Sequence, residues 1–447
     1  MTATNASALA MQGGKMTVRP AALSPWPEIT DADRRAVNAV LDRGDIWAIH
    51  GREATALEDE WAEYCGVAHC HAVNTGTAAL RCAVVAAGIQ EGDEVILPAF
   101  GYIASAQAVM LARGVPVFCD NDPRTYNLDI GAVESVITSR TRALMPVYLH
   151  GLVTDTSAIT ELAARRNLAV IPDAAQAAGA TENGRRAGGF GTCTAFSLNG
   201  QKPFQSAEGG LITTDDPEVF TAVSRFAALG EDRPRHLKPG ETRASWAGYV
   251  GEQYRLTEIT ATLARSQLRR LDSYLATARQ NAADLAAGLA DIPGFDPPYV
   301  PEECESSHYR WRLRLDPAAY GWEGSLTEFR DRVLYGLQKE GVAADTWQLH
   351  PLPAHPVIRR RDRRPWAPSM DASPLEVWNP GRYPVASRLL ASSITLGADP
   401  YPLHVQRREV IADYVRAFHK LAENMKTVMT APYEPVRPAP SIPVSDL

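Results

Sequence analysis

The sequence predicts an α/β fold with a mostly parallel sheet, followed by a smaller α/β domain. Three observations support this prediction. The chain has 447 residues, more than one hydrophobic core usually holds. Up to about residue 215, short apolar runs alternate with helical periodicity, as in successive βαβ units. After Pro293 the residue pattern changes, and apolar and charged residues alternate at 309–315 as in an antiparallel strand.

The expected elements of the first half follow from local patterns. Strands are expected from apolar and β-branched runs, and helices from apolar residues three and four positions apart. Thr30 or Asp31 is a candidate N-cap of the first helix. The expected strands cover 69–74, 93–98, 116–120, 142–148, 168–172, 195–198 and 211–214, and the expected helices cover 31–43, 54–65, 78–87, 103–112 and 157–166.

The second half is expected to begin with a long bridging helix. An Ala-, Leu- and Arg-rich region at 257–289 has helical character, and further helices are expected at 326–340 and 404–424. We therefore expect four parts: a loose N-terminal arm at 1–20, a large domain at 21–270, a small domain at 271–430 and a Pro-rich tail at 431–447.

Composition excludes several classes of protein. The net charge is −7 and the pI is near 5.9, which does not suit a nucleic-acid or anionic-membrane partner. No apolar run is long enough to cross a bilayer, and no secretion signal is visible, so a cytoplasmic protein is expected. The six cysteines form no Cys-x-x-Cys pair and are expected to be reduced. His69 and His71 lack a second ligand cluster, so no metal is expected.

A candidate phosphate site follows the strand at 69–74. There Thr75, Gly76 and Thr77 form a short turn before an Ala- and Leu-rich helix. N–H groups at the start of a helix point outward, and the helix dipole favours an anion. Helix-capping threonines give the same pattern, so a purely structural role stays open. No Gly-x-Gly-x-x-Gly follows the first strand, and no Walker-type loop is present.

A lysine and an aspartate suggest a particular cofactor. Lys202 lies between two short strands, where its compact amine suits Schiff-base chemistry, although most lysines are simply exposed. Asp173 ends an apolar strand and requires a cationic partner, unless it caps a helix. The pyridinium nitrogen of pyridoxal phosphate is such a partner. Together with Tyr102 and the turn at 75–77, both residues follow strand carboxyl ends, where α/β proteins bind ligands.

Five segments carry a resemblance to a known family. Residues 75–80 (Thr-Gly-Thr-Ala-Ala-Leu), 98–102 (Pro-Ala-Phe-Gly-Tyr), 173–176 (Asp-Ala-Ala-Gln), 196–202 (Phe-Ser-Leu-Asn-Gly-Gln-Lys) and 208–210 (Glu-Gly-Gly) occur in this order. The chain resembles the DegT/StrS-type aminotransferases, which are fold-type I, pyridoxal-phosphate-dependent enzymes with a seven-stranded type of sheet. The resemblance extends over residues 9–424. Residues 10–15 and the Asn-Gly at 199–200 are similar to the branch that makes aminocyclitols and 3-amino-5-hydroxybenzoate.

The resemblance implies a role for each matching residue. Lys202 forms the Schiff base with the cofactor and moves a proton between substrate and cofactor carbons. Asp173 keeps the ring nitrogen protonated, Tyr102 stacks on the ring, and Gln176 lies near the ring face or the phenolic oxygen. The candidate phosphate-binding residues are Thr75, Gly76, Thr77 and Ser197.

The chain departs from the family at three positions. Gln253 stands where the family usually has an Asn that reaches the phosphate of the neighbouring subunit. The aligned contact implies a homodimer with shared active sites. Ala207 replaces a usual glycine, and Asn199 stands where sugar enzymes often have His, which weakens the case for a nucleotide-sugar acceptor.

The expected function is a ping-pong amino transfer. L-glutamine or L-glutamate would convert the cofactor to pyridoxamine phosphate, and the amine would pass to a ketone of a sugar, cyclitol or secondary-metabolite precursor. Another pyridoxal-phosphate reaction (dehydration, elimination or decarboxylation) and a non-catalytic sensor that binds cofactor or aminosugar are the alternatives. Loop residues that are candidates for the substrate pocket are Trp47, His50, Arg52, Trp347 and His350.

Overall fold

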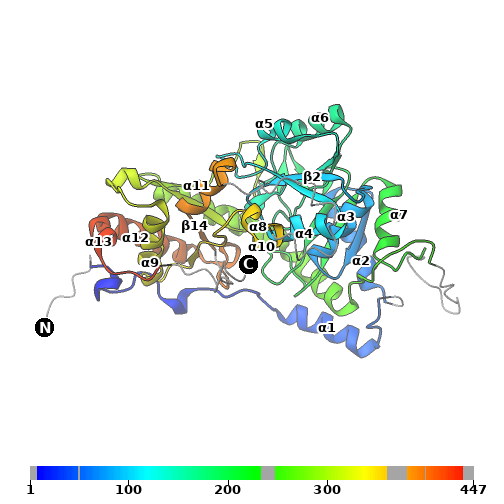
Figure 1. The fold of residues 1–447 in the computed structure, drawn as a ribbon. Coiled ribbons are helices and arrows are strands. Elements are labelled where there is room, and N and C mark those ends of the chain that lie inside the picture. Colours follow the sequence, from blue (N-terminus) through cyan, green and yellow to red (C-terminus); the bar gives the residue numbers. More distant parts are fainter. Residues whose placement is uncertain (1–7, 49–50, 233–246, 360–379, 398, 436–447) are drawn as a thin grey trace.

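The computed structural model describes residues 8–48, 51–232, 247–359, 380–397 and 399–435. Within them the chain forms two lobes that lie side by side (Figure 1). The larger lobe contains the central sheet, and the smaller lobe contains the last helices of the chain. The N-terminal segment extends along the small lobe before it reaches the large one (Figure 1).

One half of the central sheet is parallel, as predicted. Its four strands lie in the order β3 (Val115–Cys119), β2 (Glu94–Pro98), β4 (Thr141–Leu144) and β5 (Ala169–Val170). All five residues of β2 are buried, because helices cover both faces of this part. Parallel strands place their carboxyl ends at one edge, and this edge carries the site described below.

Asp173 joins this half to three further strands. Isolated parallel bridges link Asp173 to Val147 on one side and to Ala195 on the other. Beyond them lie β8 (Thr194–Ser197), β9 (Gly210–Thr214) and β1 (His69–Val73). Only β9 runs against its neighbours, since it pairs antiparallel with both β8 and β1. The seven strands confirm the predicted, mostly parallel fold-type I sheet.

Helices begin where the sequence supplies a cap. Thr30 and Asp33 form a capping box at the start of α1 (Asp31–Arg43). The other helices of the large lobe are α2 (Glu53–Cys65), α3 (Gly76–Ala86), α4 (Ile103–Leu111), α5 (Ile130–Val133), α6 (Thr156–Arg166) and α7 (Pro217–Phe226).

The long helix α8 (Glu258–Leu289) connects the two lobes. Its first half packs Leu271 and Leu275 into a core of the large lobe. Its second half packs Leu285 and Leu289 into the core of the small lobe. The predicted domain boundary at 270–271 therefore lies inside a helix that both lobes share.

The small lobe is built around an antiparallel sheet. Its strand order is β10 (Phe295–Asp296), β12 (Trp311–Leu315), β14 (Ser393–Leu396) and β13 (Ala344–Asp345). A separate small sheet joins β6 (Thr181–Glu182), β7 (Arg185–Arg186) and β11 (Cys304–Glu305). The helices of this lobe are α9 (Leu326–Lys339), α12 (Arg408–Glu423) and α13 (Met425–Thr430), whereas α10 (Pro356–Arg359) and α11 (Pro384–Ser392) pack apolar residues into the core of the large lobe.

The N-terminal arm is not loose where the structure describes it. Leu9 and Val18 are fully buried in the core of the small lobe. Glu340, itself 1% exposed, accepts hydrogen bonds from Ala10 N at 2.8 Å and from Thr17 Oγ1 at 2.7 Å. Leu9, Val18 and the distant Glu340 carboxylate thus hold the arm in place. The mostly polar composition of the arm gives no sign of this docking.

The last long helix starts at Arg408 and not at His404. The His404 ring packs against Trp26, with 4.4 Å between ring centroids, and is 2% exposed. The Asn281 side chain donates to the carbonyl oxygens of Leu403 and Gln406. These contacts hold the segment in a 3-10 turn, so the predicted start was four residues early.

Candidate active site

Lys202 follows β8 and faces the small lobe. Its backbone N–H donates to Asn199 O at 2.8 Å, which closes a turn. Its Nζ lies 4.1 Å from the centroid of the Tyr309 ring. Tyr309 is 4% exposed and precedes β12, so the amine lies where the two lobes meet. The sequence singled out Lys202 but not Tyr309, because only the fold brings them together.

Asp173 is buried at the carboxyl edge of the sheet. Its Oδ2 accepts a hydrogen bond from Ser105 Oγ at 2.6 Å, and its Oδ1 accepts one from Ala175 N at 3.0 Å. Burial raises the pKa of Asp173, while both hydrogen bonds and the charge of Lys202 oppose this rise. The structure thus couples the two predicted catalytic residues electrostatically.

Tyr102 and Ser105 lie at the start of α4. Tyr102 is the N-cap residue, and its side chain is 52% exposed. Ser105 is fully buried, and its hydroxyl contacts both Tyr102 O and Asp173 Oδ2. Sequence reasoning missed Ser105. The sequence feature that could have indicated Ser105 is a hydroxyl within the mostly apolar helix that directly follows Tyr102.

The predicted phosphate residues gather where α3 begins. Thr75 Oγ1 accepts from Ala78 N at 3.0 Å, so Thr75 caps the helix. A Cβ on Gly76 would lie 2.6 Å from Ser197 Cβ, so only glycine allows this approach. The first N–H groups of a helix, here those of Gly76 and Thr77, lack intrahelical acceptors and can bind an anion. The helix start and β8 thus form a narrow backbone cradle.

Gln176 connects the carboxyl edge of the central sheet, where Asp173 lies, to the small lobe. Its Oε1 accepts from the backbone N–H of His150 at 2.7 Å. Its carbonyl oxygen accepts from Ser307 Oγ at 2.8 Å. Gln176 is 5% exposed and lies three residues after Asp173, so it reaches the same edge of the sheet.

Gln253 is exposed and lies apart from these residues. It forms an antiparallel bridge with Ala228, and the next residue, Tyr254, accepts from Asn74 N at 2.7 Å. This places the segment beside the turn at 75–77. In the part of the chain that the structure describes, no interaction joins the Gln253 side chain to Lys202 or Asp173.

Charged and aromatic residues from the small lobe complete the surroundings of Lys202. Arg310 Nη1 donates to Asp345 Oδ2 at 3.0 Å, and its Nη2 lies 3.5 Å from Asp399 Oδ2. Burial raises the pKa of Asp399, and the charges of Arg310 and Lys202 oppose this rise. The Arg310 guanidinium also lies 5.7 Å from the Trp347 ring centroid. Trp347 is thus the predicted pocket residue that the fold places near the lysine.

The other pocket candidates differ in position. Trp47 is 52% exposed near the end of α1, and Arg52 precedes α2 and is exposed. His350 is exposed just before Pro351. His50 lies outside the residues that the structure describes.

The site residues fit pyridoxal phosphate. The buried Asp173 carboxylate accepts two hydrogen bonds within the described residues, and it suits a cationic ring nitrogen. A helix start opposite Ser197, in a cradle that a Cβ would fill, suits a phosphate. The amine of Lys202, whose charge acts on Asp173, suits an aldehyde.

Fold and site together define an aminotransferase. The chain matches the DegT/DnrJ/EryC1/StrS aminotransferase family over residues 27–383, and it belongs to this family. Members of this family use pyridoxal phosphate. None of the helices in the described ranges is long and apolar enough to span a membrane.

Three relatives show how similar the chain is to characterised proteins. It is 38% identical to a GDP-perosamine synthase of Caulobacter vibrioides, over 71% of this chain and 81% of that protein. It is 33% identical to the L-glutamine:scyllo-inosose aminotransferase of Streptomyces griseus, over 90% of this chain and 95% of that protein. A crystal structure of 3-amino-5-hydroxybenzoic acid synthase superposes with a TM-score of 0.77 at 28% identity, covering 90% of this chain and 98% of that one.

Proposed function

We propose that this aminotransferase uses pyridoxal phosphate to move an amino group from L-glutamine or L-glutamate to a ketone on a cyclitol or sugar. The buried Asp173 facing the charge of Lys202 is the observation that carries this proposal. The Streptomyces griseus relative, which aligns with 90% of this chain, is named as an aminotransferase of L-glutamine and scyllo-inosose. All six cysteines are buried and none forms a disulfide, which supports a protein that acts in the reducing cytoplasm.

The residues of this chain would divide the chemistry among them. Bound pyridoxal phosphate supplies an aldehyde and a ring that withdraws electrons from the substrate carbon. Asp173 would hold the proton on the ring nitrogen, and Lys202 would bond the aldehyde and then carry protons to and from the substrate carbon. Tyr102 would cover one ring face, and Gln176 would lie near the ring face or the phenolic oxygen.

The phosphate would bind at the start of α3. The N–H groups of Gly76 and Thr77, with the hydroxyls of Thr75 and Ser197, are the proposed donors. Gln253 is exposed, so in a homodimer it would reach the phosphate of the partner subunit rather than its own.

A neutral cyclitol is the acceptor that the surroundings of Lys202 favour. Asp345 and Asp399 bring carboxylate oxygens close to Arg310, and Asp399 also interacts with Lys202. Carboxylates accept hydrogen bonds from hydroxyl groups, and they repel the diphosphate of a nucleotide sugar. Asn199, in the loop before Lys202, donates to Glu208 Oε1 at 2.9 Å, and this adds no positive charge.

An acceptor panel tests this proposal. The protein with pyridoxal phosphate and L-glutamine is incubated with scyllo-inosose, its 2-deoxy derivative or a nucleotide-linked keto sugar, and amine products are measured by mass spectrometry. We expect amination of a cyclitol and none with Lys202→Ala. Amination of the nucleotide sugar alone would replace the proposed acceptor. Elimination or decarboxylation products without amine transfer would favour a different cofactor reaction, and cofactor binding without any turnover would favour a sensor.

A further inference from the structure

Arg310, which immediately precedes β12, and Arg312 and Arg314 within it alternate with apolar residues along the chain. Trp311, Leu313 and Leu315 pack into the core of the small lobe. Two of the arginines have an oxygen partner at the interface of the lobes: Arg310 donates to Asp345, and Arg314 donates to Pro123 O at 3.0 Å, with Asp296 Oδ2 at 3.9 Å. The middle one, Arg312, forms no ion pair with a carboxylate in the described residues.

Arg312 is a buried cation with neutral partners. It is 0% exposed, its Nε donates to His150 Nε2 at 2.8 Å, and its Nη1 donates to Ser393 Oγ at 2.7 Å. Burial and the neighbouring charges of Arg312 and Arg310 lower the pKa of His150 well below its usual value, so the imidazole is neutral. Burial also lowers the pKa of Arg312 to about 10. The charge of Asp345 opposes this lowering, but no carboxylate contacts Arg312 in the described residues, and a buried cation without such a contact is strongly unfavourable.

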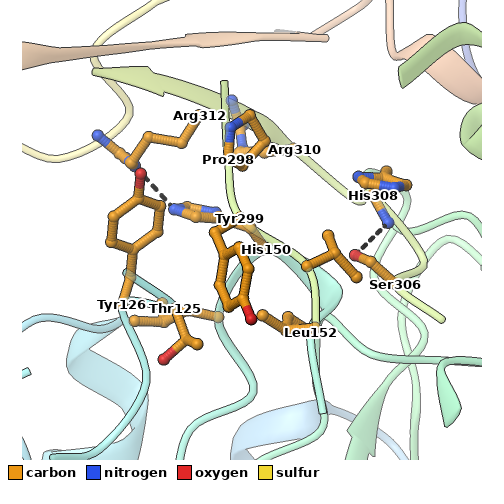
Figure 2. Close-up of a pocket in the computed structure, with 12 residues that line it drawn as sticks. Thr125, Tyr126, His150, Leu152, Pro298, Tyr299, Ser306, His308, Arg310 and Arg312 are labelled. Carbon is orange, nitrogen blue, oxygen red and sulfur yellow. Dashed lines mark hydrogen bonds between the residues drawn. The ribbon is translucent and has the colours of Figure 1, made fainter. Parts of the chain in front are cut away.

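A small cavity lies beside Arg312. Figure 2 shows the residues that line it, with Tyr126 and Arg312 on the same side of the His150 ring. The lining comes from both lobes: Tyr126 and His150 belong to the large one, and Arg310 and Arg312 to the small one.

Four polar atoms on these lining residues are buried and have no hydrogen-bond partner among the residues that the structure describes. They are the Tyr126 hydroxyl, His150 Nδ1, Arg310 Nε and Arg312 Nη2. Because His150 Nε2 accepts from Arg312, the proton of the neutral ring is on Nδ1, which is then a donor. All four groups can therefore donate a hydrogen bond, and their residues are at most 7% exposed. Buried donors without acceptors are rare, and such a set needs an acceptor.

The backbone is also constrained at this cavity. Tyr126 has φ of 66°, His150 has φ of 55° and His308 has φ of 45°. Such backbone conformations are uncommon for residues other than glycine, and they persist where the surrounding structure fixes them. Three left-handed residues in one lining add independent support for a built site.

We propose that this cavity is a binding site for a small monovalent anion of the size of chloride. Arg312 Nη2 and the Tyr126 hydroxyl are its main ligands. The volume of the cavity is about 20 Å³, which is enough for one small ion and too little for a sugar or a nucleotide. The ion joins donors from both lobes. The ion also holds the His150 ring in place, and the backbone N–H of His150 donates to Gln176 Oε1.

Anion exchange on the full-length protein tests this site. Unfolding temperature is measured in sodium chloride, bromide, formate and gluconate at constant ionic strength, and bromide is located by anomalous scattering in crystals. We expect a higher unfolding temperature in chloride and bromide than in gluconate, and a bromide peak within hydrogen-bond distance of Arg312 Nη2. Arg312→Met should abolish the chloride dependence, and the control Arg314→Met should retain it.

A milder variant keeps the test valid if Arg312→Met does not fold. Tyr126→Phe removes one donor with little change in volume, and it should weaken chloride binding about tenfold, the effect of one charge-assisted hydrogen bond. Equal unfolding temperatures in chloride and gluconate, together with no bromide peak, would overturn the proposal in favour of water. Stabilisation by formate but not by halides would assign the cavity to a carboxylate ligand and would also overturn the proposal.

Discussion

At the Asp173 carboxylate, burial and hydrogen bonding act in opposite directions. Burial is the largest influence and raises the pKa, whereas Ser105 Oγ, Ala175 N–H and the charge of Lys202 lower it. The proposed role requires the ionised form, since only a carboxylate stabilises a protonated ring nitrogen. Ser105 is therefore a positioning residue that keeps Asp173 ionised.

We predict that Ser105→Ala shifts the acid limb of the pH profile of kcat/KM to higher pH by about one unit. The hydrogen bond lowers the pKa of Asp173, so its loss raises that pKa further, and activity then falls at a higher pH as the pH decreases. Ser135→Ala, at an exposed serine that donates to Ala132 O, is the matched control. An unchanged acid limb in Ser105→Ala would refute this role for the serine.

At the scale of elements, Glu340 after α9 fixes the N-terminal arm. Its carboxylate accepts from Ala10 N, Thr17 Oγ1 and Lys420 Nζ, the last at 2.9 Å from α12. Glu340 is 1% exposed, and the side chain of Lys420 is 12% exposed. Arm, α9 and α12 thus share one buried ion pair.

We predict that Lys420→Met lowers the free energy of unfolding by about 3 kcal/mol, because it leaves the buried Glu340 charge unpaired. Urea denaturation measures this change. Lys426→Met removes an exposed lysine from α13 and should stay within about 0.5 kcal/mol of the wild type. Equal effects of the two variants would show that the ion pair does not hold the arm.

The sequence predicted most elements because their signals are local. The candidate cap Thr30 marked the first helix correctly, and apolar runs located the strands of the large lobe within a few residues. The direction of β9 and the docking of the arm depend on distant partners, which no local pattern contains.

The candidate site was predictable only in part for the same reason. The structure joins Lys202 to Asp173, and Gly76 to Ser197, from segments that the motifs had identified. Ser105 and Tyr309 were missed, because each becomes significant only through a contact with a residue more than 60 positions away.

At the scale of the whole molecule, exposed apolar residues support the proposed dimer. Tyr249 and Val250 are 62% and 95% exposed, and they immediately precede the segment of Gln253. Trp47 and Ile46 are about half exposed as well. Large exposed apolar side chains are candidates for burial in an interface, and a second copy of the chain is the proposed partner.

We predict that mixing two inactive variants restores activity. In a dimer of Lys202→Ala with Gln253→Ala, one site combines Lys202 of one subunit with Gln253 of the other. If Gln253 acts across the interface, that site is intact, and statistical exchange should restore about a quarter of wild-type activity.

Each variant alone, taken through the same unfolding and exchange procedure, is the control for this mixture. Absence of recovery in a mixture that contains the mixed dimer would place Gln253 in its own subunit's site. A monomer in analytical ultracentrifugation would remove the shared site altogether.

The most direct measurement of the central claim is a visible absorption spectrum of the protein with pyridoxal phosphate, titrated with L-glutamine and L-glutamate. The account predicts a visible band that Lys202→Ala lacks. It also predicts that one of the two donors bleaches the band and leaves pyridoxamine phosphate in the denatured sample. A wild-type protein that shows no band would contradict the cofactor assignment. A band that neither donor converts would contradict the proposed amino donors.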